Sequence, residues 1–452
     1  MSESAVLVSS ADLQEVPVQN TDSQCEIFAV EPEFPPQLPP LIELLTSKVE
    51  DEFKPCLATA LFAPLAVHMS GYTYRYLDNK ARQCVFESVT IAPSGVGKSL
   101  LDDPIEAIIA DIKEETDRLN REEEEWKQTC KSLPRNAPRL DRPVGERQVL
   151  PANATNPTLV KRILDANGKF LYTRTSELAL LTKMCGTSGV SEVLRLAFDC
   201  APYGQARVGE DGVNGEAPLR WMFNASSTIA QARNFFGKGE FANGAGSRIM
   251  VSTIRREPDA GIPFQGDYDE QFMSELQVYI QRLLQAKGEI GDARITESIK
   301  RLYEKTEERI KIASPDIQQA LRPLLNRAYI IAMSKAIVLY VAHDGEWNSV
   351  MEDFVEWSLN YDLHCKMTFF GDQVIREMQA EYEAAQACAK PAKTNLLSSL
   401  PSIFTREELV KLHILAGCDA SKARKRATDN IAKWKKRGKI TEGDGGTYHK
   451  ID

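Results

Sequence analysis

The clearest chemical pattern in this chain lies at residues 92–99, which read APSGVGKS. Glycines at 95 and 97 let the backbone turn so that successive N–H groups converge, as they do in loops that bind phosphate. Lys98 would reach the β- and γ-phosphates of a nucleotide, and the hydroxyl of Ser99 would ligate Mg²⁺. The segment therefore predicts a site for ATP and Mg²⁺.

One position departs from the G-x-x-x-x-G-K-[ST] pattern, because Ala92 stands where the first glycine is expected. Alanine is small enough for the tight turn at the start of the loop, so we interpret the segment as a variant. The alternative is a chance Gly/Ser turn before a helix. The residues predicted to contact the nucleotide are Ser94, Gly95, Val96, Gly97, Lys98, Ser99 and Leu100.

Hydrolysis also needs a base that orients the attacking water. In this class of fold the base follows a strand beside the phosphate loop, usually in an Asp-Glu pair. The strand expected at 170–173 leads to Glu177, which occupies the base position, whereas Ser176 stands where the Mg²⁺-orienting Asp is expected. Ser176 would hold a metal-bound water instead. Alternatively, Glu177 only opens the following helix, where acids are favoured.

A polar residue follows the next expected strand, at 219–223. A side chain at such a strand tip commonly contacts the γ-phosphate or the attacking water, so we assign this role to Asn224. In the alternative interpretation, Asn224 and the serines after it cap the next helix.

Arg248 opens the last expected strand, at 248–254, after a Gly-Ser pair. From the edge of the sheet it would reach the γ-phosphate bound by a neighbouring subunit, which is the role of an arginine finger. Arg255 and Arg256 are further candidates. The alternative is a surface arginine paired with an acid.

A glycine-rich stretch between Glu177 and Asn224, at 201–218, predicts a hairpin that projects from the sheet. In ring ATPases a hairpin at this place faces the central channel. Arg207 would then contact nucleic-acid phosphate and Tyr203 a base face. An ordinary surface hairpin fits the same residues.

The end of the chain concentrates positive charge. Two helices, the second at 421–437, and a two-stranded wing are expected after residue 404. A helix–turn–helix–wing with a basic second helix favours DNA binding, with protein binding as the alternative. The predicted nucleic-acid contacts on that helix are Lys422, Arg424, Lys425, Arg426, Lys433 and Lys436.

These residues need a framework that brings strand ends together. Strands alternate with helices from the loop to residue 254, which predicts an α/β fold with a mostly parallel sheet wrapped by helices. One long helix is expected at 105–131 and a strand at 148–152. Beyond residue 263 the apolar spacing is wholly helical, over 273–286, 295–313, 317–343 and 350–387.

The chain therefore divides into five predicted parts. They are a disordered tail at 1–31, an extended segment with helices at 32–80, a P-loop ATPase core at 81–262, a helical domain at 263–390 and a winged-helix-like DNA-binding module at 400–452, with a linker at 390–394 before it.

Bulk composition limits the function classes. The net charge of −9 argues against nonspecific nucleic-acid binding by the whole chain, so any such contact needs a local basic patch. No apolar run approaches the length needed to span a bilayer, and we expect no membrane association. Nine cysteines without a C-x-x-C pair predict free thiols in the cytoplasm and argue against a zinc site.

Together these motifs resemble a family of P-loop ATPases of phages, plasmids and integrated mobile elements, often the helicase half of primase–helicase proteins. The resemblance rests on the entry Phe34-Pro35, the 92–99 loop, Ser176-Glu177, Asn224 and residues 246–248, with the C-terminal wing. It implies a RecA-like or AAA+-like core, ATP with Mg²⁺ and ring assembly on DNA. No primase metal motif is visible in the sequence.

The sequence thus predicts an ATP-hydrolysing DNA motor, a ring-forming replicative helicase of a mobile genetic element. In the ring, ATP would lie between Lys98, Ser99 and Glu177 of one subunit and Arg248 of the next. Two alternatives remain: a non-motor, ATP-dependent DNA-binding initiator or regulator, and a defence-related ATPase whose partner is a protein.

Overall fold

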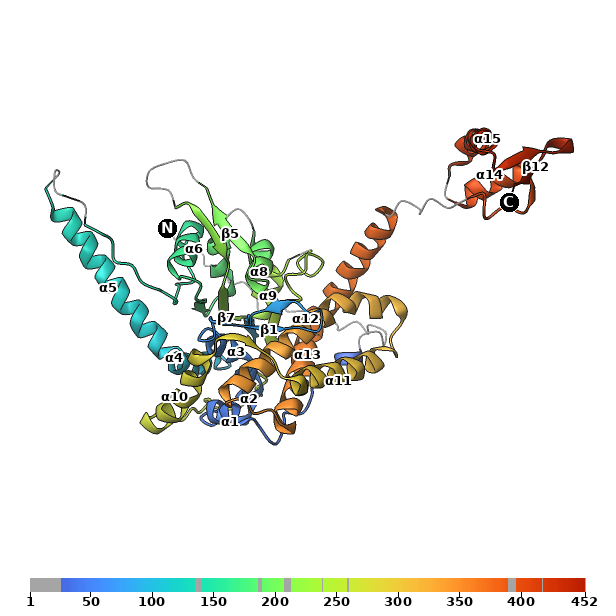
Figure 1. Ribbon diagram of the computed structural model, residues 1–452. Helices are drawn as coiled ribbons and strands as arrows, with labels where there is room; N and C mark the ends of the chain where they lie inside the picture. The colour runs from blue at the N-terminus through green and yellow to red at the C-terminus, as the bar shows by residue number, and fades with distance from the viewer. Residues whose placement is uncertain are drawn as a thin grey trace, which may run out of the picture. The chain divides into compact units, whose positions relative to one another are not determined.

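The structure is a computed structural model of the 452-residue chain. It describes residues 26–451 except 135–137, 139, 186–188, 207–212, 238, 258–259, 389–395 and 417. Contacts divide the chain into two compact units, Met1–Gln379 and Ala380–Asp452 (Figure 1). The first unit joins the predicted segments at 32–80 and 81–262, and most of 263–390, around one core of buried side chains. The predicted linker lies outside the described residues.

A four-stranded sheet forms the centre of the first unit, and every neighbouring pair of its strands is parallel. The strand order is β4-β7-β3-β8. Nearly all residues of these strands are buried, as expected for a parallel sheet covered on both faces. Their carboxyl ends meet at one edge, where open α/β sheets bind ligands. The strands are β3 (Glu87–Ile91), β4 (Leu171–Thr175), β7 (Trp221–Ser227) and β8 (Ile249–Ser252).

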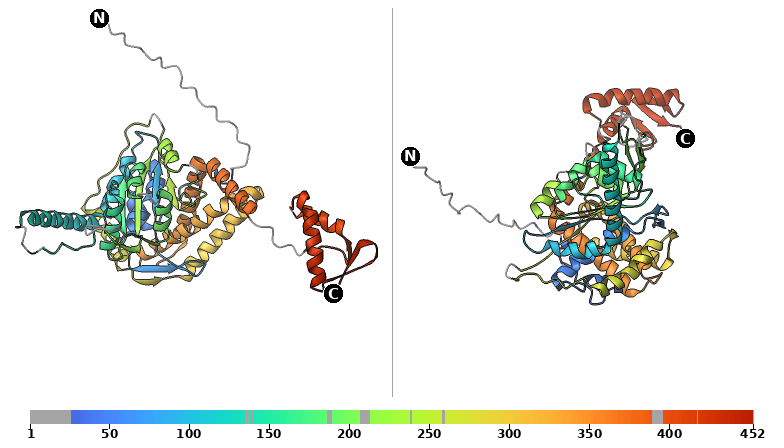
Figure 2. Two further views of the ribbon diagram at one scale, coloured as in Figure 1. Left: turned by 90° about the horizontal axis from the view of Figure 1, so that it is seen from above. Right: turned by 90° about the vertical axis from the view of Figure 1, so that its left-hand side faces the viewer.

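Helices connect these strands, which confirms the predicted α/β alternation. The expected single helix at 105–131 is wrong, because the helix breaks at Ile109 and continues as α5, which extends away from the sheet (Figures 1 and 2). The strand expected at 148–152 is reduced to one bridge, between Val149 and Tyr172. The helices are η3 (Lys98–Leu101), α4 (Asp102–Ile108), α5 (Ala110–Ser132), α6 (Asn156–Asp165), η4 (Leu178–Leu181), α7 (Thr182–Cys185), α8 (Val190–Phe198) and α9 (Ile229–Phe235).

Two further groups of helices complete the unit. An N-terminal group comprises α1 (Pro40–Thr46), η2 (Asp51–Phe53), α2 (Lys54–Ala60) and α3 (Phe62–Ala66). Of these, α2 packs on β3 and β8, and α3 packs on β7. The second group confirms the helices predicted beyond residue 263; it comprises α10 (Glu270–Gln285), α11 (Ala293–Ile310), α12 (Pro315–Ala342) and α13 (Ser349–Cys388).

Helix α12 is long and apolar enough to cross a bilayer by length and composition, which corrects the expectation that no such run exists. Within the fold, 78% of that stretch is buried. The core helix of a globular unit passes the same test, because it is apolar all round.

Two smaller sheets were less visible in the sequence. Strands β1 (Tyr72–Arg75), β2 (Ala81–Arg82) and β9 (Gly288–Ile290) form a sheet in the order β2-β1-β9, although 72–82 and 288–290 carry little strand pattern. The predicted glycine-rich hairpin is present as β5 (Pro202–Gln205) and β6 (Gly215–Pro218).

The tail at 1–31 was predicted to be disordered. Its described part, residues 26–31, is packed. Residues Glu26–Phe28 form a 3₁₀ turn, η1, and Phe28 is buried. Its carbonyl oxygen lies 2.7 Å from Nδ1 of His364, and the guanidinium of Arg309 lies 4.8 Å from its ring centroid. The prediction of disorder is therefore wrong for 26–31, because Ile27 and Phe28 are buried and Arg309 also donates to the carbonyl oxygen of Ile27.

The described residues of the second unit form the end of α13, two further helices and a three-stranded antiparallel sheet in the order β10-β12-β11. Thr405 caps α14 through a capping box with Glu408, as the sequence predicts. The sheet has one strand more than the expected two-stranded wing. The elements are β10 (Ile403–Thr405), α14 (Arg406–Leu415), α15 (Ala420–Lys436), β11 (Ile440–Glu442), η6 (Asp444–Gly446) and β12 (Thr447–Lys450).

Candidate functional site

The glycine-rich loop starts where β3 ends, at the carboxyl edge of the parallel sheet. Gly95 and Gly97 both have left-handed backbone angles, with φ of +83° and +92°. A Cβ at Gly97 would lie 2.7 Å from Cδ1 of Leu100 and 2.9 Å from Cγ of Pro263. At Gly95, by contrast, the described residues leave open space within 4 Å. The loop thus has one packed side and one open side.

Lys98 closes the loop on itself. Its Nζ donates to the carbonyl oxygens of Ala92, at 3.1 Å, and Pro93, at 2.7 Å. Partial burial lowers the pKa of the Lys98 ammonium from its ordinary value. These two bonds hold the ammonium at the first turn of the loop, where it would contact an anion bound by the loop.

The other predicted contact residues differ in their exposure. Ser94, Gly95 and Ser99 are exposed, and Val96 and Gly97 are half-buried. The exposed hydroxyl of Ser99 is free to face a metal ion. Leu100 is buried in the core and its backbone N–H donates to the carbonyl oxygen of Gly97 at 3.0 Å, so its predicted contact with the nucleotide is wrong.

Glu177 and Ser176 are exposed just beyond the carboxyl end of β4. We expected the strand that leads to the candidate base to lie beside the loop strand. The structure corrects this expectation, because β7 lies between β4 and β3. Thr175 pairs with Ala225, and Ile91 pairs with Ser227. The first register ends at Thr175, whose hydroxyl accepts from the backbone N–H of Glu177 at 3.1 Å, so Glu177 lies beyond the strand, at the sheet edge where the loop begins.

Asn224 does not lie at a strand tip, which corrects the prediction. Strand β7 continues three residues further, to Ser227, and Asn224 is 3% exposed. Its Oδ1 accepts from the hydroxyl of Tyr172 at 2.8 Å, and its Nδ2 donates to the carbonyl oxygen of Ala60 at 2.8 Å. Both the oxygen and the nitrogen of the amide are therefore hydrogen-bonded inside the core. The residue of β7 that pairs with the last residue of β3, where the loop begins, is Ser227.

An ion pair that the sequence analysis missed ties the loop helix to the base strand. Arg174 in β4 binds Asp102, the first residue of α4, with Nε at 2.9 Å from Oδ1. The same guanidinium reaches Oγ of Ser226 in β7, at 3.4 Å. The acid after the loop was readable from the sequence, but its partner lies 72 residues away. This pair fixes Glu177 relative to the loop.

Arg248 is not exposed at the sheet edge, so the prediction of an outward-pointing arginine is wrong. It is 7% exposed, and its Nη2 lies 2.9 Å from Oδ2 of Asp199 in the same chain. Its Nη1 donates to the carbonyl oxygen of Gly244 at 2.7 Å, and its guanidinium lies over the ring of Phe198. Its Nε is buried without a hydrogen-bond partner among the described residues, while its other two nitrogens bind groups of the same chain, so Arg248 forms a structural ion pair inside the unit.

The two lesser candidates differ from each other. The side chain of Arg256 is 9% exposed and binds Glu50 at 2.7 Å. The side chain of Arg255 keeps 54% of its surface exposed, although Glu31 lies 2.9 Å from its Nη1. Of the three arginines, Arg255 alone remains accessible to another molecule.

The hairpin does not present Tyr203 to a ligand. Its side chain is 7% exposed, and its hydroxyl accepts a hydrogen bond from Nδ2 of Asn156 in α6. Tyr203 is therefore a packing residue, and its predicted contact with a base face is wrong. Arg207 lies outside the described residues.

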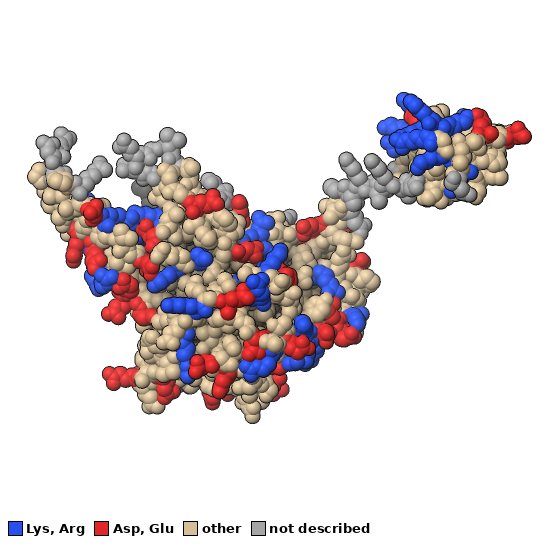
Figure 3. All heavy atoms as spheres, viewed as in Figure 1, with Lys and Arg blue, Asp and Glu red and all other residues tan. Residues whose placement is uncertain are grey.

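All six basic residues predicted to bind nucleic acid are exposed on α15. The buried side of that helix consists of Ala423, Ala427 and Ile431. Lys and Arg side chains gather on one face of this unit (Figure 3). The exposed residues are Lys422, Arg424, Lys425, Arg426, Lys433 and Lys436.

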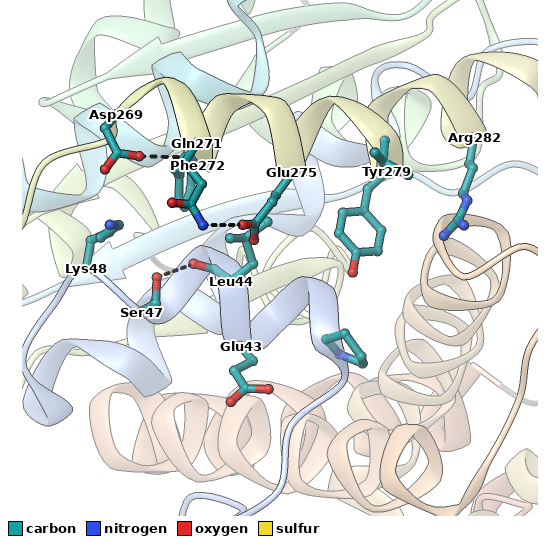
Figure 4. Close-up of a pocket in the computed structure, with 12 residues that line it drawn as sticks. Glu43, Leu44, Ser47, Lys48, Asp269, Gln271, Phe272, Glu275, Tyr279 and Arg282 are labelled. Carbon is teal, nitrogen blue, oxygen red and sulfur yellow. Dashed lines mark hydrogen bonds between the residues drawn. The ribbon is translucent and has the colours of Figure 1, made fainter.

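A separate groove of about 610 Å³ lies between α1 and α10 (Figure 4). It contains none of the predicted site residues. Its charged lining is mixed, with three carboxylates and two basic side chains, so it offers no single charge to a ligand. These are Glu43, Lys48, Asp269, Glu275 and Arg282.

Comparison with protein-family models and with curated proteins finds no match to this chain.

Proposed function

We propose that this chain is an ATP-hydrolysing DNA motor with a P-loop core and a winged-helix-like DNA-binding module, and that it works as a ring. The assignment to a replicative helicase of a mobile genetic element rests on the resemblance given above. ATP is the substrate and Mg²⁺ the metal of this proposal.

The observation that carries the proposal is the self-closed loop at the carboxyl edge of the sheet. Lys98 is held by two loop carbonyl oxygens, and the open side at Gly95 leaves room for a ligand. The backbone N–H groups between them form a cradle suited to phosphate. Ser99 would hold Mg²⁺, which when bound offsets charge on the phosphates.

Glu177 is the proposed general base, since it is exposed just beyond the carboxyl end of β4, at the sheet edge where the loop begins. A water between the loop and β4 would give its proton to Glu177 as it attacks the terminal phosphate. Ser227 and Ser226 replace Asn224 as the nearest polar groups of β7. In an assembled ring, Arg255 replaces Arg248 as the arginine contributed by the neighbouring subunit.

The Glu177→Gln variant should bind ATP with unchanged affinity but hydrolyse it at least ~100-fold more slowly, because the amide cannot accept the proton. Calorimetry with Mg·ATP and a phosphate-release assay measure the two effects. Glu192→Gln, at an exposed acid of α8, is the matched control. Hydrolysis at the wild-type rate by Glu177→Gln would show that Glu177 only opens η4.

The basic face of α15 should bind DNA through its phosphates, which makes affinity depend on salt. The double variant Arg424→Gln/Lys425→Gln should lower the slope of log K against log salt concentration by about 1.8 on duplex DNA. Fluorescence anisotropy over a salt series measures this slope. The double variant Lys300→Gln/Lys311→Gln, in α11 and at its C-cap, makes the same change in charge elsewhere. An equal slope for both variants would remove α15 from the interface.

A non-motor role is the second candidate, in which ATP binding assembles a DNA-binding initiator or regulator. The burial of Tyr203 favours it, since the predicted base contact of a channel hairpin is not accessible. A strand-displacement assay separates the two functions. A motor unwinds a forked duplex with ATP, whereas a switch binds the same duplex and leaves it intact.

A further inference from the structure

A second hollow, of about 620 Å³, lies at the opposite edge of the parallel sheet from the phosphate loop. Two of its lining residues mark this place, since Val85 precedes β3 and Arg220 precedes β7. From Val85 to Ala92 the chain is extended over seven steps, roughly 20 Å. The volume is in the range of small-molecule sites. This hollow is therefore separate from the candidate nucleotide site.

Four basic side chains from four different parts of the unit line this hollow, which we call the basic cavity. Lys80 lies between β1 and β2, Arg82 lies in β2, Arg220 precedes β7, and Arg327 lies in α12. The one carboxylate of the lining is Asp199. The charged lining of the basic cavity is therefore mainly positive, whereas that of the groove between α1 and α10 is mixed.

The carboxylates nearby do not offset this charge. Asp199 is shared by Arg248, at 2.9 Å, and Arg327, at 3.8 Å. Asp78 binds Arg82 at 2.8 Å. With Arg248 included, five basic side chains face two carboxylates, which leaves three positive charges.

The hydrogen bonds in the basic cavity also remain incomplete. Nε of Arg82 is buried and has no hydrogen-bond partner among the described residues. Arg220 donates through Nε to Oε1 of the neutral Gln83, at 2.7 Å. Repulsion by Arg248 and Arg82 adds to burial in lowering the pKa of Arg327. A buried donor without an acceptor destabilises the fold, so an anion that accepts from it would be stabilised at this place.

Glu87, the first residue of β3, does not supply the missing charge. Burial raises the pKa of its carboxyl group well above the ordinary value, and neither oxygen has a hydrogen-bond partner among the described residues. A protonated Glu87 is neutral, so the excess of positive charge stays.

We propose that the basic cavity binds a small anion that carries phosphate groups, at a site independent of the phosphate loop. Guanidinium groups that converge from a hairpin, a strand and a helix suit phosphate oxygens because each offers paired N–H donors. Ser334 also lines the cavity, and its hydroxyl shares a hydrogen bond with the hydroxyl of Tyr74 at 2.8 Å. Because β3 joins the cavity to the loop, an anion here would stiffen the strand that carries the loop.

The probe is inorganic pyrophosphate, titrated by calorimetry into the full-length Lys98→Ala chain, in which the loop lacks its ammonium. We expect one binding event per chain. The double variant Lys80→Gln/Arg220→Gln, made in the Lys98→Ala chain, should weaken the affinity for pyrophosphate at least ~10-fold for each charged hydrogen bond lost. Arg75→Gln, at an exposed arginine of the same hairpin, is the matched control and should leave it unchanged.

Lys80→Gln alone, at an exposed turn residue, tests the proposal should the double variant not fold. The absence of binding to the Lys98→Ala chain, or equal affinity in Lys80→Gln and Arg75→Gln, would overturn the proposal. Displacement of pyrophosphate by an oligothymidylate, with the same loss in the cavity variants, would overturn the assignment to a small anion. ATP binding by the wild-type chain is measured separately, so this result does not depend on the proposed function.

Discussion

Replacing Lys98 with alanine should abolish ATP hydrolysis, with a loss of at least ~100-fold, and weaken Mg·ATP binding by at least ~10-fold. The ammonium is the positive charge of the loop itself, and no other basic residue occurs between 92 and 99. The variant also removes the bonds to the carbonyl oxygens of Ala92 and Pro93. A phosphate-release assay and calorimetry, each with and without single-stranded DNA, measure these losses.

The fold should tolerate this change. Pro93 is exposed, so water can replace the lost bond to its carbonyl oxygen, and we expect a loss of about 0.5–1.5 kcal/mol in unfolding free energy. Lys131→Ala, at an exposed lysine of α5, controls for the change in charge. Wild-type hydrolysis by a folded Lys98→Ala protein would show that the loop is a structural turn.

What the sequence predicts well is local in the chain. The loop residues are consecutive, and glycine at 95 and 97 matches the left-handed backbone that the structure has there. The capping box at Thr405 and the helices beyond residue 263 depend on spacings of three or four residues. Their formation needs only the hydrogen bonds and apolar faces of the segment itself.

The errors concern residues whose surroundings come from distant parts of the chain. Arg248 was expected to be free, but Asp199, 49 residues earlier, binds it. Asn224 was placed at a strand end, but its amide is held by Ala60, 164 residues away. Tyr203 is buried by contact with α6. In the sequence, a polar residue after an apolar run indicates the end of a strand. Only its contacts with distant residues show that the strand continues.

The sequence pattern also did not predict the order of the strands in the sheet. The loop strand and the base strand are separated by β7, which comes later in the chain than both. Pairing depends on long-range contacts and on how the helices cover the sheet, and neither is encoded in the spacing of apolar residues. The same holds for Arg174 and Asp102, whose ion pair joins the two elements that a phosphate site needs to keep in register.

Gly97→Ala should destabilise the first unit by roughly 2–5 kcal/mol and also reduce Mg·ATP binding. A residue with a Cβ at φ of +92° costs about 1–2 kcal/mol. The methyl group would in addition lie 2.7 Å from Leu100, 2.9 Å from Pro263 and 3.3 Å from Phe53. These neighbours need to move apart, and such overpacking costs about 1–3 kcal/mol. Urea unfolding, followed by fluorescence, measures the loss.

Gly95→Ala is the matched control, because it has the same left-handed strain without the clash. Its φ is +83°, and its Cβ would enter open space. We therefore expect a loss of only about 1–2 kcal/mol, with the difference between the two variants giving the cost of packing at the base of the loop. If both variants lose the same stability, Gly97 does not seat the loop against Leu100 and Pro263. In that case its conformational freedom alone explains the glycine, and the packed side of the loop has no role in placing Lys98.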